Sequence, residues 1–158
     1  MTPERIIMAA RSWIGTRYQH QGRLKKTDFH KGGCDCLGLL VGVASDLHLS
    51  HAGRLLSSFD QTDYGHIPDA TRLMQNLSML LQEIPQRQMQ AGDVLLLNID
   101  GNPQHLGMLT HYSGQADMWG IIHSYAPARG VVEHRFDADW IKKIISVFRF
   151  RGLSFEGT

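Results

Sequence analysis

The residues best suited to chemistry lie between Gly32 and Leu40. Cys36 follows two glycines and Asp35, and apolar residues at helical spacing come after it. This pattern predicts a helix that begins at Cys36 and has Asp35 as its N-cap. A cysteine at a helix start faces unpaired backbone N–H groups and the positive end of the helix dipole, which favour the thiolate. The segment therefore predicts a nucleophilic cysteine that is ionised near neutral pH.

The two cysteines also allow other interpretations. Cysteine is among the most buried residue types, so Cys36 could be a small core residue. A zinc site would need further Cys or His at short recurring spacings, whereas the nine histidines of this chain are scattered. A disulfide between Cys34 and Cys36 would close a small, strained ring. We therefore expect neither a metal nor another cofactor.

A thiol nucleophile needs an imidazole to take its proton and a further group to orient that imidazole. His105 starts a predicted strand after a turn, and Gly107 on the same face leaves room beside its ring. His123 interrupts an apolar strand, where an imidazole needs a hydrogen-bond partner. His111 lies about 20 Å along the strand from His105, and the position of His134 near a strand end favours no role. The sequence thus favours His105 and His123 as the pair that would assist the thiol.

The elements that must position these residues change type along the chain. Helical periodicity predicts helices over Pro3–Ile14, from Cys36 to about Leu49, and from about Asp69 to Glu83. Gly38 and Gly42 share one face of the second helix, which predicts close packing there. Strand patterns follow at Val94–Ile99, His105–Tyr112, Trp119–Tyr125, Gly130–Arg135 and Ile144–Phe150, with a short helical turn capped by Asp137 before the last. Helices followed by antiparallel strands predict an α+β domain.

The polar stretch from Thr16 to Gly33 is basic. Its composition is typical of a solvated loop, and a rim that attracts a carboxylate-bearing substrate is the alternative interpretation. Residues 50–68 show no regular pattern.

The bulk properties are those of one soluble domain spanning residues 1–158. The chain is 42% hydrophobic and 20% charged, and its net charge of +1 gives no general attraction to nucleic acid or to a membrane surface. No apolar run is long enough to span a membrane, and the N-terminus does not resemble a signal peptide. We expect a protein that is cytoplasmic as synthesised.

Five segments together resemble the NlpC/P60 family of papain-like cysteine peptidases. Their order and spacing cover the chain from Gly15 to Phe150. The matching segments are Trp13–Tyr18, Asp35–Leu39, Ala91–Leu95, His105–Met108, and Ile122–Tyr125 followed by Gly130–Val132.

The resemblance implies a papain-like α+β fold in which a nucleophile helix packs on an antiparallel sheet. It implies Cys36 as nucleophile, His105 as base and His123 as the orienting third residue. Tyr18 and Asp35 would contact substrate. The backbone N–H of Cys36 is a candidate oxyanion donor.

Members of the family cleave bacterial cell-wall peptides, typically at the γ-D-glutamyl to diamino-acid bond of the peptidoglycan stem peptide. The short Cys-Asp-Cys-Leu-Gly form is most similar to members carried by phages, which predicts phage tail proteins as partners and a virion-associated location. Two departures bear on specificity: Leu37 stands where the family usually has Ser, and the loop over residues 19–31 is longer and more basic. The alternatives are a non-catalytic tail or cell-wall binding module, a thiol acyltransferase or amidase on the same scaffold, and a redox or metal protein built on Cys34 and Cys36.

Overall fold

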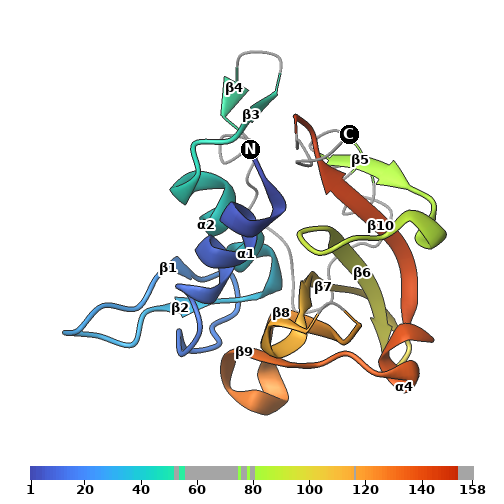
Figure 1. The fold of residues 1–158 in the computed structure, drawn as a ribbon. Helices are drawn as coiled ribbons and strands as arrows, with labels where there is room; N and C mark the ends of the chain where they lie inside the picture. The colour runs from blue at the N-terminus through green and yellow to red at the C-terminus, as the bar shows by residue number, and fades with distance from the viewer. Residues whose placement is uncertain (52–53, 56–74, 76–77, 79–80, 116, 153–158) are drawn as a thin grey trace.

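The computed structural model describes residues 1–51, 54–55, 75, 78, 81–115 and 117–152. It has two layers, which Figure 1 shows side by side. Helices α1 (Pro3–Arg11) and α2 (Cys36–Asp46) form one layer. The other is a six-stranded antiparallel sheet with the strand order β5-β10-β6-β7-β8-β9. Its strands are β5 (Leu81–Ile84), β6 (Val94–Ile99), β7 (Asn102–His111), β8 (Trp119–Tyr125), β9 (Gly130–Arg135) and β10 (Ile144–Phe150).

The two faces of the sheet carry separate apolar clusters. On one face Leu106 of β7 packs with Leu39 of α2. On the opposite face Leu109 of β7 belongs to the cluster against which Trp140 packs, and Trp140 comes from the short helix α4 (Ala138–Ile141). Because side chains alternate along a strand, His105 shares the face of Leu109. The histidine therefore lies on the side of the sheet away from α2.

Most of the predicted strands are confirmed. Four of the strands, β6, β8, β9 and β10, begin and end at the predicted residues, whereas β7 begins earlier, at Asn102. Asp137 caps α4 as expected, because its carboxylate accepts the N–H of Trp140. In the part of the chain that the structure describes, three short 3-10 turns join the elements: Gln86–Gln88, Tyr112–Gly114 and Ala126–Ala128.

The prediction of a helix from Asp69 to Glu83 is wrong at its end. Residues 81–84 form β5, whose main chain pairs with β10, so a long-range strand partner overrides the local helical stripe. Gln75 and Ser78 are helical, and the rest of the predicted helix lies outside the described residues.

The polar stretch Thr16–Gly33 is not all loop. It contains β1 (Arg23–Leu24), which pairs with β2 (Gly33–Cys34). The segment expected to be irregular, 50–68, begins with a second small antiparallel pair, β3 (Ser50–His51) with β4 (Arg54–Leu55), and its remainder lies outside the described residues.

The helix that begins at Cys36 ends at Asp46, earlier than predicted. His48 takes a left-handed conformation at φ 50°, and the N–H of Leu49 donates back to the carbonyl of Ala44. This pattern closes the last turn of a helix. The close packing predicted for its glycine face is confirmed, since the carbonyl of Gly22 lies against Gly38 and the ring of Trp13 lies against Gly42.

None of the helices among the described residues combines the length and apolar character needed to cross a bilayer.

Candidate active site

Asp35 is the N-cap of α2, as the sequence predicts. Its φ and ψ are −95° and −172°, and its Oδ1 accepts the N–H of Gly38 at 2.8 Å. Its Oδ2 accepts the N–H of Gln21 at 2.8 Å, and the Arg23 guanidinium lies 3.1 Å from Oδ1. The residue is 4% exposed. Both carboxylate oxygens therefore have partners that hold the start of the helix, with Cys36 as its first residue.

The Cys36 sulfur lies beside the main chain of β7, next to His105. Its S–H donates to the carbonyl of Gln104 at 3.9 Å, and the N–H of Leu106 faces it from the other side of His105. The pairing of β7 with β8 runs only from Met108 to His111, so this earlier part of β7 has a free edge where the sulfur can approach. The site is where β7 and β8 diverge.

Burial raises the pKa of the Cys36 thiol to about 12, and the charge of Asp35 raises it further. The N–H groups of Leu106, Leu37 and Cys36 itself act in the opposite direction and favour the thiolate, as expected for a helix start. They are outweighed by the burial of the sulfur, and Cys36 lines one small cavity together with apolar residues that include Leu39, Leu40 and Met108. Burial at this position therefore opposes the thiolate that the sequence predicts near neutral pH and favours the neutral thiol.

Three histidines form a continuous chain of ring contacts on the α4 face of the sheet. His105 Nε2 lies 2.6 Å from His123 Nδ1, and His123 Nε2 lies 2.8 Å from His134 Nε2. His134 Nδ1 then donates to the carbonyl oxygen of Arg135 at 2.8 Å. His105 and His123, the two histidines that the sequence favours, are thus brought together.

The histidine chain is shielded from water at its centre. His123 has 0% exposure, whereas His105 and His134 are partly buried. Burial lowers the pKa of His105 to about 4. The pKa of His123 is lowered as well, by burial first and then by the neighbouring His105 and His134. His105 and His123 are therefore neutral imidazoles near pH 7, the form in which a ring can accept a proton.

His134 is the residue that sequence reasoning missed. The strand ends predicted for β8 and β9 contain the signal, because pairing Tyr125 with Gly130 places His123 opposite Val132. His134 is two residues further along and on the same face, which brings it diagonally beside His123. The register of these two strands is thus the sequence signal that places a third ring in the site.

Tyr18 also lies at the site. The pKa of its phenol is raised by burial first, and then by electrostatic interaction with Cys36 and Asp35. Its N–H donates to the carbonyl of Arg129 at 3.0 Å, and its main chain bridges to Cys34. The Gly-Thr-Arg-Tyr segment is thereby placed between β9 and the start of α2.

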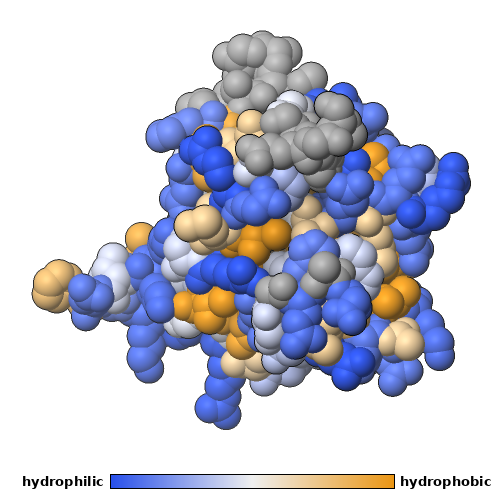
Figure 2. Space-filling model, viewed as in Figure 1, coloured by the Kyte–Doolittle hydropathy of each residue, from blue (hydrophilic) through white to orange (hydrophobic). Residues whose placement is uncertain are grey.

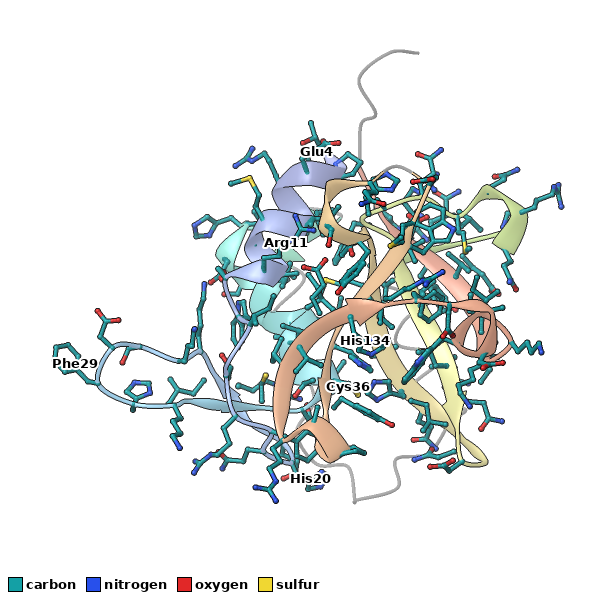
Figure 3. The ribbon with its side chains drawn as sticks, turned by 60° about the horizontal axis from the view of Figure 1, so that its bottom comes forward. Glu4, Arg11, His20, Phe29, Cys36 and His134 are labelled. Atoms are coloured by element: carbon teal, nitrogen blue, oxygen red, sulfur yellow. The ribbon has the colours of Figure 1, made fainter. Side chains whose placement is uncertain are left out.

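The tip of the basic loop lies away from the sulfur. The chain between β1 and β2 reaches away from the body as an arm, which Figure 2 shows in the same view as Figure 1. Its outermost labelled residue, Phe29, is 97% exposed and lies far from Cys36 in Figure 3. Lys25, at the base, pairs with Asp46 at 3.0 Å.

The described residues contain no cluster of three or more His, Cys, Asp or Glu side chains arranged to hold a metal ion.

A cysteine at the start of a helix, beside an antiparallel strand that carries a histidine, is the arrangement of the NlpC/P60 type of papain-like α+β fold. Solved structures confirm this fold. NlpC1 from Trichomonas vaginalis matches with a TM-score of 0.61 at 17% identity, over 94% of this chain and 44% of its own. Ly7917 matches with a TM-score of 0.57 at 14% identity, over 95% of this chain and 63% of its own.

Ly7917 solved with the hydrolyzing product of MDP matches with a TM-score of 0.58 at 13% identity, over 96% of this chain and 64% of its own. This chain thus spans less than two thirds of each of these chains, and identities this low show the fold alone. No family model matches the sequence. No curated protein matches it either.

Proposed function

We propose that this protein is a cysteine peptidase that hydrolyses amide bonds in peptidoglycan stem peptides, at the γ-D-glutamyl to diamino-acid bond. The observation that carries the proposal is the ordered contact between His105 and His123, on the sheet whose strand β7 has the Cys36 sulfur, from the start of α2, beside its main chain. The fold shared with Ly7917, which was solved with a product of MDP, supports a peptidoglycan fragment as substrate.

The reaction we propose begins with a neutral thiol and a neutral imidazole. Cys36 Sγ turns from the Gln104 carbonyl toward the His105 ring and attacks the amide carbonyl while His105 takes the S–H proton. The backbone N–H of Cys36, at the helix start, would stabilise the oxyanion of the tetrahedral intermediate. The imidazolium then gives its proton to the leaving amine, and the acyl group remains on sulfur as a thioester.

Water completes the cycle. His105 takes a proton from a water molecule, whose oxygen attacks the thioester carbonyl. The carbon–sulfur bond breaks, the carboxylic acid leaves, and the proton returns to sulfur. His123 orients the His105 ring throughout, through the 2.6 Å contact.

Tyr18 and Asp35 would act on the substrate in different ways. Cys36 and Asp35 both act electrostatically on the Tyr18 phenol, which supports our proposal that the Tyr18 hydroxyl donates to a substrate carbonyl. The Asp35 oxygens already accept N–H groups of Gly38 and Gln21, so we propose that Asp35 acts by fixing the N–H groups at the helix start.

The partner proposal rests on the sequence resemblance to phage-type members. We propose that the protein works in association with phage tail proteins, carried by the virion. Purified virions probed with an antibody to this chain should contain it; virions that lack it would contradict the proposal.

The raised pKa of Cys36 favours one competing function, a cell-wall binding module that does not catalyse. Such a module would bind stem peptides through the same residues and release no product. A thiol acyltransferase or amidase would use the same catalytic groups and give a different product, so product analysis separates all three.

The decisive test is mass spectrometry of peptidoglycan fragments after incubation with wild type, Cys36→Ala and Cys34→Ala. We expect the wild type and Cys34→Ala to cleave one amide bond, and Cys36→Ala to give no product while its Tm stays within a few degrees. Cys34 is the matched control because it is a neighbouring thiol whose side chain is fully buried. Cleavage by Cys36→Ala at the wild-type rate, or binding without cleavage by the wild type, would contradict the proposal.

A further inference from the structure

The chain of histidine rings ends on a group that can only accept a hydrogen bond. His134 Nδ1 lies 2.8 Å from the carbonyl oxygen of Arg135. A carbonyl oxygen has no proton to give, so this contact requires the ring proton of His134 to be on Nδ1. In neutral His134 the other ring nitrogen, Nε2, is then bare, that is, it carries no proton and can only accept a hydrogen bond.

That acceptor fixes the protons of the two rings before it. His123 Nε2 lies 2.8 Å from His134 Nε2, so His123 must donate there and its own Nδ1 is bare. His105 Nε2 lies 2.6 Å from this bare nitrogen and must donate in turn. The remaining nitrogen of His105, Nδ1, therefore carries no proton. It is the ring nitrogen nearer the main chain, along which the Cys36 sulfur lies.

Aromatic side chains exclude water from the three histidine rings, so that water cannot change which ring nitrogens carry protons. Tyr125 stacks on His123 with ring centroids 4.7 Å apart, and Trp140 contacts the rings of His123 and His134 with centroids 5.5 Å and 4.9 Å away. A water molecule can donate or accept, so its presence would let either tautomer of His123 form. His123 has 0% exposure, and its two ring contacts decide its tautomer.

We propose that His134 is a positioning residue, which keeps Nδ1 of His105 bare and so able to accept the Cys36 proton. The catalytic meaning of this inference rests on the proposed function, but the placement of the protons belongs to the free protein. A donor in place of the His134 acceptor would move every proton in the chain to the opposite nitrogen. His105 would then present Nδ1–H to the sulfur and could not act as its base.

Two substitutions separate acceptor from donor at this position. His134→Gln can accept from His123 through its amide oxygen, whereas His134→Lys can only donate. The ring tautomers are measured in the free protein by nitrogen-15 NMR of labelled histidine, and cleavage of peptidoglycan fragments is measured in parallel. His111→Gln is the control, because His111 stacks on Trp119 and lies outside the chain of rings.

We expect the wild type, His134→Gln and His111→Gln to hold His105 with its proton on Nε2. We expect His134→Lys to move that proton to Nδ1 and to cut kcat by roughly 100-fold or more, as for a catalytic histidine held in the wrong tautomer. His134→Gln should keep kcat within a few-fold of the wild type. A residue that only filled space would lower Tm in both variants without moving the ring proton.

A wild-type His105 that carries its proton on Nδ1 would overturn the proposal, even if His134→Lys failed to fold. An unchanged tautomer in folded His134→Lys would overturn it too. These outcomes differ from failure of the proposed function, in which the wild type would cleave nothing while the NMR tautomers stayed as expected.

Discussion

The two halves of the candidate site are held by different kinds of contact. In the helix half, Asp35 accepts a main-chain N–H from Gly38, three residues further along the chain. In the sheet half, the contacts join side chains on separate strands, between residues 18 and 11 positions apart. A cap forms whenever its helix forms, whereas the ring contacts need the register of three strands. The helix half is therefore set locally, and the sheet half depends on the whole sheet.

The largest effect that we expect concerns the sulfur between the two halves. A pKa of about 12 for Cys36, against 9.0 for an ordinary thiol, leaves the thiol protonated at neutral pH. Its thiolate fraction should be about a thousandfold below that of an unperturbed thiol near pH 7. The rate of alkylation by iodoacetamide should therefore rise about tenfold for each pH unit between about pH 7 and about pH 10 without levelling off.

This alkylation is measured in Cys34→Ala, so that only one thiol reacts. The same variant unfolded in urea is the control, and its rate should level off near the ordinary thiol pKa. A folded-state rate that is already constant at pH 7 would mean that the helix N–H groups, rather than burial, decide the ionisation of Cys36.

The next prediction separates a buried cap from an exposed one. Asp35→Ala removes the cap of α2 and leaves the Arg23 guanidinium without its carboxylate, so we expect the free energy of unfolding to fall by about 2–3 kcal/mol. Asp137→Ala, at the exposed cap of α4, should cost about 0.5–1 kcal/mol. Urea denaturation measures both. Equal losses would show that the extra partners of Asp35 contribute nothing to stability.

The same contrast explains what the sequence could predict. The Asp35 cap, the start of α2 and four strands were predictable because each depends on neighbouring residues and on periodicity. Residues 81–84 were not, because the pairing with β10 that makes them a strand involves residues more than sixty positions away. For the pKa of Cys36 the sequence predicts only one of two opposing effects, the lowering by the N–H groups at the helix start. The burial that raises this pKa was not predictable, because the cavity that Cys36 lines is formed in part by residues of β7.

The smallest effect tests the hydrogen bond that joins the halves. Ser124 of β8 donates to the carbonyl of Cys34 at 2.7 Å, and both residues have 0% exposure. The Cys34 carbonyl also accepts the N–H of Gln19, so Ser124→Ala leaves it with one partner. We therefore expect a loss of only about 1 kcal/mol in the free energy of unfolding.

The control for Ser124→Ala is Ser12→Ala, because Ser12 also donates its hydroxyl to a carbonyl but is exposed. It should change the free energy of unfolding by less than about 0.5 kcal/mol. Cleavage should respond differently from stability: if the bond sets the position of Cys36 against the rings, Ser124→Ala should lower kcat more than its small stability loss explains. An unchanged kcat would mean that the cap and the histidine chain each hold their half without this connection.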